Sequence, residues 1–359
     1  MPTRIGGVVL LLVACLSAVA VDEALAQGPP IHTDTPIMLG LAGRGVRSFG
    51  KVVHRGKLLA DGEVIDNPDA REVTIVQFPV VVPYNLFSER FQVGFIAPLV
   101  RINAHMPEGE ASSSGLADIR LFGKYLLYQR DRLNETLRVA TKAGVKFPSG
   151  STSITPPLGS GSTDYFASAV VGWIRGRTGI YAEGIYNVNT SNNDVDFGNG
   201  FGYNLALGFR LSPAVYDIYP SRQLNLFIEM NGSTVRRSKR SGVSLENSGG
   251  TVIFLSPGLQ FVGGRRWLVE ASVQLPVVNA PNGTQLGTSW TTLAGIRVLL
   301  VGAPRNEEQD VQKNSRNQSI RADLTSLVVP GIWPVGASRH PCRRPSLNVL
   351  SGYARETSG

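Results

Sequence analysis

The stretch FGYNLALGFRL, residues 201–211, alternates between large apolar side chains and small or polar ones along its whole length. A repeat of two residues is the side-chain period of a β-strand, so the two sets lie on opposite faces. One face is continuously apolar, whereas the other carries Asn204 and Arg210. This stretch therefore predicts a strand that separates an apolar medium from a polar one.

Similar alternation recurs along the middle of the chain. It is present in FQVGFIAPLV, ADIRLFGKYLLYQ, RVATKAGVKF, QLNLFIEM and RWLVEASVQL, which begin at residues 91, 117, 138, 223 and 266. Soluble β-sandwiches also alternate, so the repetition carries more weight than any one segment. No apolar run after residue 26 approaches the roughly 20 residues of a membrane-spanning helix. Any span of a membrane must then consist of strands.

The connections between these segments differ in length in a regular way. About twelve strands can be placed from Lys51 onwards, joined alternately by brief connections such as DRLNE and GRT and by long ones such as PSGSTSITPPLGSGST. Short turns at one end and long loops at the other are typical of outer-membrane barrels. The sequence therefore predicts an all-β chain, a transmembrane antiparallel up-and-down β-barrel, with both of its ends on the short-turn, periplasmic side.

Composition and the N-terminus indicate an exported protein. Only 17% of the 359 residues are charged, and the first 26 combine Arg4, an apolar run and an ALA cleavage pattern typical of a signal peptide. A lipoprotein signal ending at Cys15 is the alternative. Removal of Cys15 leaves Cys342 as the single cysteine, so no internal disulfide is expected. Four scattered histidines offer no metal-ligand spacing, and we expect no metal and no cofactor.

The chain divides into four predicted parts. Residues 1–26 are the signal peptide, and residues 49–301 form the barrel. Residues 27–48 lack alternation and are either a periplasmic leader or a plug inside the barrel. Residues 302–359 contain polar runs without barrel periodicity, so we expect a disordered, dispensable tail.

The parity of each strand assigns a set of polar side chains to the lumen. Cations at every fourth position of RVATKAGVKF fall on the face opposite to its apolar residues. Rings of basic groups favour anions in pores, but a hydrated, mutually neutralising wall is the simpler alternative. The predicted lumen-lining and selectivity residues are Asp118, Arg120, Lys124, Arg138, Lys142, Lys146, Glu183, Asn204, Arg210, Glu229, Glu270 and Arg297.

Several motifs together resemble a known family. GLADIRLFGKYLLYQRD, KAGVKFPSGS, LGSGSTDYFASAVVGW and SPGLQFVGGRRWLVEASVQLPV are similar to the MetA-pathway of phenol degradation family of outer-membrane proteins. The resemblance runs from about Arg47 to Val301. It implies an outer-membrane barrel that admits small, often aromatic or hydrophobic compounds, and it transfers no catalytic residue.

We therefore expect a channel or transporter in the Gram-negative outer membrane for passive passage of small solutes. A soluble exported β-sandwich and a barrel-embedded hydrolase are the alternatives; the hydrolase would need a nucleophile beside a base, which the histidine contexts do not offer, so we expect no enzyme. Expected partners are outer-membrane lipid and lipopolysaccharide, the latter through RRSKR at residues 236–240, but no nucleic acid. The solute, the oligomeric state and whether the lumen is open or plugged stay undecided.

Overall fold

A computed structural model describes residues 28–132, 134–215, 222–264 and 266–300. The expected signal peptide and the expected tail lie outside the described residues. No helix in the described ranges is both long enough and apolar enough to cross a membrane.

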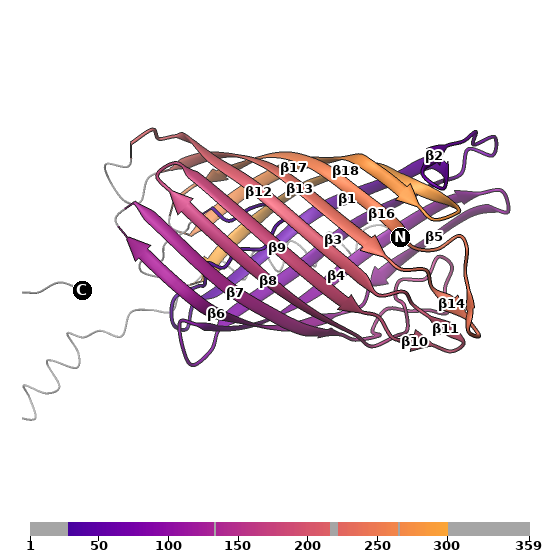
Figure 1. Cartoon of the computed structure of the whole chain (residues 1–359), viewed down its shortest axis with the longest axis horizontal. Coiled ribbons are helices and arrows are strands. Elements are labelled where there is room, and N and C mark those ends of the chain that lie inside the picture. Colours follow the sequence, from indigo (N-terminus) through magenta and orange to yellow (C-terminus); the bar gives the residue numbers. More distant parts are fainter. Residues whose placement is uncertain (1–27, 133, 216–221, 265, 301–359) are drawn as a thin grey trace, which may run out of the picture. The chain divides into compact units, whose positions relative to one another are not determined.

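The described chain folds into a closed antiparallel barrel (Figure 1). The main sheet contains 14 strands, and leaving out the short additions β2 and β5 gives twelve strands in the wall. Pairing of the last strand with the first, from Arg44↔Leu300 to Ala60↔Thr284, closes the sheet. The wall strands are β1 (Arg44–Ala60), β3 (Glu72–Asn85), β4 (Phe91–Met106), β6 (Arg120–Arg132), β7 (Glu135–Lys146), β8 (Asp164–Arg175), β9 (Thr178–Val188), β12 (Gly200–Ser212), β13 (Gln223–Val235), β16 (Gly250–Val262), β17 (Trp267–Pro281) and β18 (Thr284–Leu300).

The predicted fold class is confirmed, and so is the alternation on which it rests. In β12, Leu205 and Leu207 are 45% and 49% exposed, whereas Ala206 between them is completely buried. The outer face of the wall is apolar because strands such as β16 and β17 alternate between exposed and buried positions over most of their length. The soluble β-sandwich is wrong, because the sheet closes on itself through β1 and β18.

Most tight turns lie at one end of the barrel and most long connections at the other, although β17 and β18 are joined by a two-residue turn at the long-loop end. The connections β6–β7 and β8–β9 are tight turns at one end, where β1 begins and β18 ends. The other end carries the long connections, and most of the short strands gather there in Figure 1. The short strands are β2 (Glu63–Val64), β5 (Gly109–Leu116), β10 (Ser191–Asn192), β11 (Val195–Asp196), β14 (Lys239–Arg240) and β15 (Val243–Ser244).

Two details differ from the strand placement expected from the sequence. The first strand begins at Arg44, so residues 44–48 of the expected leader belong to the wall. The β6–β7 ladder shifts register between Leu126 and Tyr128, so that Leu127 and Tyr128 are both exposed on the outer face. A bulge of this kind reverses the parity of every later residue in the strand.

Candidate functional site: a lumen crossed by the chain's own N-terminal segment

Residues 28–43, which we call the lumen segment, lie inside the barrel. They have no strand structure, yet Ile31 and Thr33 are only 1% and 4% exposed. The segment contacts Gln260 on β16 at its start and Asn85 at the end of β3 near its own end, through Pro29 O and Leu39 O. Between these contacts it crosses to β6 and β7. The segment thus fills the lumen from one wall to the other.

The strongest anchor is the Glu229 carboxylate on β13, which is 1% exposed. It accepts hydrogen bonds from the consecutive backbone N–H groups of Ile31 (2.7 Å), His32 (3.1 Å) and Thr33 (2.7 Å), and from the Thr33 hydroxyl (2.7 Å). Successive N–H groups that converge in this way form an anion-binding nest. The segment therefore wraps its backbone around a charge that the wall supplies.

A second anchor has the opposite polarity. Asp34 of the segment accepts from the ammonium groups of Lys124 on β6 and Lys142 on β7, each at 2.6 Å. Its backbone N–H donates to Glu183 on β9 at 3.1 Å. Burial raises the pKa of Asp34, but the two ammonium groups lower it more, and its pKa falls below the ordinary value of 3.8. Asp34 is therefore a charged link between the segment and three strands.

A third anchor joins the strands at the closure of the barrel, β1, β17 and β18, to the lumen segment. Glu270 on β17 pairs with Arg47 on β1 at 2.7 Å and with Arg297 on β18 at 2.8 Å. The same two guanidinium groups donate to Ile31 O at 2.5 Å and to Pro30 O at 2.6 Å. The strands β1 and β18, which close the barrel, thus also bind the lumen segment.

Apolar contacts complete the fit between segment and wall. Ile31 packs in a buried cluster with Tyr181, Phe227 and Leu293. Met38 packs against a second cluster that includes Leu126 and Val170. The lumen is therefore not uniformly polar, and removal of the segment would uncover two apolar areas of its wall.

At the long-loop end, Lys146 holds the connection between β7 and β8 over the mouth. Its ammonium group lies 3.1 Å from Asp118 and 2.5 Å from Asp164, and it donates to Ser160. Asp118 also accepts from the backbone N–H groups of Gly150 and Ser160, at 3.0 Å each. One carboxylate thus fastens both ends of this loop.

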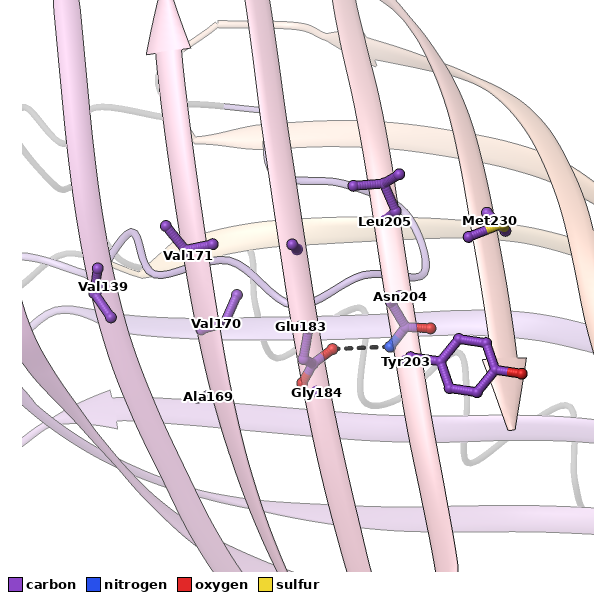
Figure 2. A pocket seen from close by; sticks show the side chains of 11 residues that line it. Val139, Ala169, Val170, Val171, Glu183, Gly184, Tyr203, Asn204, Leu205 and Met230 are labelled. Carbon is purple, nitrogen blue, oxygen red and sulfur yellow. Dashed lines mark hydrogen bonds between the residues drawn. The ribbon is translucent and has the colours of Figure 1, made fainter. Parts of the chain in front are cut away.

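The remaining predicted lumen residues also face inward, and Asn204 shares Glu183 with the second anchor. Arg138 bonds Asp131 at 2.9 Å, and Asn204 donates to Glu183 at 3.0 Å, a bond drawn in Figure 2. Arg120 lies over the ring of Phe166, at 6.0 Å from its centre. Arg210 donates to Pro213 O at 3.1 Å, near the short-turn opening. The structure therefore distributes the predicted set over seven of the twelve wall strands, from β6 to β18.

Sequence reasoning did not identify several polar residues at this site. Asp34 and Arg47 fall in the part expected to be leader or plug, and Asp164 lies at the very start of its strand. Asp131 follows the β6 bulge, which reverses its parity. Since most of the predicted cations pair with carboxylates, the structure favours the neutralising wall over a basic ring. A role of these residues in selectivity stays a prediction.

A histidine and a serine meet inside the barrel. His32 Nε2 lies 3.0 Å from the Ser272 hydroxyl, which itself donates to Pro257 O at 2.8 Å. Burial lowers the pKa of His32 to about 3, with help from Lys51 and Arg47. The serine proton is engaged by a carbonyl, so His32 donates to the hydroxyl instead of activating it. Among the described residues, no group of three or more His, Cys, Asp or Glu side chains is placed to hold a metal ion.

The segment leaves a vestibule at the short-turn opening. This cavity of about 320 Å³ is bounded by Gly28 of the segment and by wall residues that include Tyr181, Phe227, Arg210 and Asn225. Aromatic and polar groups therefore share its lining. A small solute that enters through the short-turn opening would reach the lumen segment in this cavity.

The MetA-pathway of phenol degradation family model matches residues 69–293. This chain belongs to that family. The match covers β3 to β17 and the first part of β18, and it lies within the extent of the sequence resemblance, which is confirmed. No curated protein matches the chain.

Solved structures agree with the fold of this family member. An outer membrane channel from Pseudomonas putida F1 is similar at a TM-score of 0.58 and 13% identity, over 77% of this chain and 99% of that chain. The beta domain of the Bordetella autotransporter BrkA gives 0.41 at 11% identity, over 71% and 98%. A Pseudomonas aeruginosa FadL homologue gives 0.28 at 8% identity, over 72% and 88%. The first likeness shows the fold; the other two carry no argument.

Proposed function

We propose that this protein is an outer-membrane channel through which small solutes pass when the lumen segment moves aside. The observation that carries the proposal is the closed barrel, which has an apolar outer face and is filled by residues 28–43 through noncovalent contacts alone. An outer membrane channel from Pseudomonas putida F1 with the same fold supports the assignment.

The apolar part of the lumen indicates the solute class. Displacing Ile31 would expose Tyr181 and Phe227, and displacing Met38 would expose Leu126 and Val170. Such surfaces favour solutes with aromatic or aliphatic parts over sugars and ions. The vestibule beside Tyr181 and Phe227 provides an apolar contact for such a solute before the segment moves.

The lumen cations are already paired with carboxylates, so they should attract anionic solutes only weakly. Lys124, Lys142 and Arg297 already have carboxylate partners within 2.8 Å. A passing anion would compete with those partners. We therefore expect weak ion selectivity in the intact protein, in contrast to the basic ring considered from the sequence.

The test is transport by the full chain reconstituted in liposomes and planar bilayers. We expect low ionic conductance, together with faster uptake of a small aromatic compound than of a sugar of similar size. A variant that lacks residues 30–41 should conduct ions in large, steady steps, because the wall remains closed without the segment. Heat-dependent gel mobility serves as the control for barrel formation. A folded deletion variant that stays silent, or that passes neither solute class, would refute the channel.

A further inference from the structure

A charged surface and an apolar hollow occur together on the outside of the barrel. The charged surface consists of Arg236, Arg237, Lys239 and Arg240, in the connection between β13 and β16. All four are exposed. No described carboxylate lies within ion-pair distance of them, although Asp196 stands opposite Lys239 in the β11–β14 ladder. We call these four residues the basic rim.

The basic rim is held in a fixed place. β14 pairs with β15 and with β11, in a sheet of four short strands at the long-loop end of the barrel. The backbone N–H of Arg236 donates to Asn199 O at 2.9 Å, which ties the rim to the start of β12. The cations are therefore part of an ordered platform and not a loose loop.

Directly below the rim, the outer wall is aromatic. Phe201 and Tyr186 are opposite each other on β12 and β9, and they are 48% and 46% exposed. Tyr165 on β8 is 51% exposed at the same end of the barrel. Outward aromatic residues mark the level of the lipid head groups in outer-membrane barrels. The next residues outward from this level are the cations of the rim.

Further along the same strands, the wall is hollowed. A cavity of about 440 Å³ opens on the outer face, with small residues Ala169, Ala182 and Gly184 as its floor. Figure 2 shows Val139, Val171, Leu205 and Met230 on the neighbouring strands around it. The exposed residues at the edge of this hollow are apolar. Val171 is 38% exposed, Leu205 45% and Met230 41%.

The separation of the two features matches one leaflet. Met230 and Arg236 are six positions apart, or roughly 20 Å at about 3.3 Å per residue. A strand tilt of about 40° reduces this to about 15 Å along the bilayer normal. Half of a hydrocarbon core of about 30 Å is the same length. A lipid with its charge at the rim would thus place the end of an acyl chain in the hollow.

We propose that this face binds a phosphorylated lipid of the outer leaflet, the lipid A part of lipopolysaccharide, with its phosphates on the basic rim and one acyl chain in the hollow. Phosphate groups fit a platform of Arg and Lys, which donate charge-assisted hydrogen bonds to several oxygens at once. The aromatic residues between the basic rim and the hollow lie at the boundary between the lipid head groups and the acyl chains, where aromatic side chains are favoured. The site requires the barrel in an outer membrane but is independent of what the lumen transports.

The test measures binding of purified lipopolysaccharide to the full-length protein in detergent. Replacement of all four cations by glutamine (R236Q, R237Q, K239Q, R240Q) should weaken binding about tenfold or more. The matched control removes the same charge at the short-turn end (R90Q, R132Q, R175Q, R222Q) and should bind as the unmodified protein does. Equal loss in both variants would overturn the proposal.

Two further measurements separate the parts of the ligand. Enzymatic removal of the phosphates from lipopolysaccharide should weaken its binding to the unmodified protein as much as the four glutamine substitutions do. If the unmodified protein binds the dephosphorylated and the intact lipopolysaccharide equally well, the phosphate contact is refuted. Filling the hollow with G184L or A169L should weaken binding of both ligands, and no effect would refute the acyl site. Vesicles of phosphatidylglycerol that bind as well as lipopolysaccharide would refute lipid A as the occupant. Gel mobility of each variant checks that the barrel has formed.

Discussion

Replacing Glu229 with glutamine should release the lumen segment. Glutamine keeps one side-chain oxygen but replaces the other with an NH₂ group, which cannot accept the bonds from Thr33 N and the Thr33 hydroxyl, both at 2.7 Å. A hydrogen bond to a charged group contributes about 1.5–3 kcal/mol, and the freed hydroxyl can turn elsewhere. The docked state should therefore lose about 3 kcal/mol. At about 1.4 kcal/mol per factor of ten, the ratio of open to closed channels rises roughly 100-fold.

Single-channel recording in planar bilayers measures this ratio directly. The control is Ser256→Ala, because the Ser256 hydroxyl donates to Asn231 at 2.8 Å and does not bond the lumen segment. We expect frequent openings in E229Q and none beyond those of the unmodified protein in S256A. Equal open probability in all three proteins would show that the Glu229 contacts do not keep the lumen closed.

The other predictions concern the remaining anchors and the outer wall. Asp34→Asn leaves Lys124 without its carboxylate and Lys142 with Glu183 alone, at 3.6 Å, so the reversal potential in a salt gradient should shift towards anions; an unchanged potential would contradict this. Because the pKa of Asp34 is lowered below 3.8 in the docked state, its contribution is complete above that pH and weakens progressively as the pH falls further, so the open probability should be constant from pH 5 to 8 and should begin to rise below about pH 4. Glu270→Gln leaves two arginines uncompensated and should cost about 3–5 kcal/mol, visible as a lower urea midpoint, while Glu72→Gln, the same change at the exposed start of β3, should shift the midpoint little. Leu207→Arg, on the lipid-facing wall, should destabilise the vesicle-inserted barrel by about 2–4 kcal/mol; a midpoint equal to that of the unmodified protein would place Leu207 away from lipid.

The wall could be predicted because lipid imposes a strict rule on every strand. Each outward position must be apolar, so Leu205, Leu207 and Ile228 identify the opposite face without any tertiary information. Parity then places Glu229 and Glu270 inside, as the structure does. The same reasoning assigns the wrong face beyond a bulge, as at Asp131, because one extra residue changes the face.

The contents of the lumen could not be predicted in this way. Residues 28–43 have no side-chain period, and their anchors join residues far apart in the chain, such as Asp34 with Lys124 at a separation of 90 residues and Ile31 with Glu229 at a separation of 198. The apolar part of the lumen was missed for a related reason. Tyr181 and Phe227 occupy inward positions that parity alone assigns to polar surroundings, and their burial arises from Ile31 of the segment.

The anchoring of the lumen segment also sets an order of assembly. The segment is synthesised before every strand that holds it, and Arg297, which donates to Pro30 O, lies 267 residues later on the last strand. This contact therefore requires β18 to be in place, and pairing of β18 with β1 is the step that closes the wall. Contacts of such long sequence separation form late, because the intervening chain must first be ordered. We therefore expect docking of residues 28–43 to be completed no earlier than closure of the wall, because the Arg297 contact is absent until then.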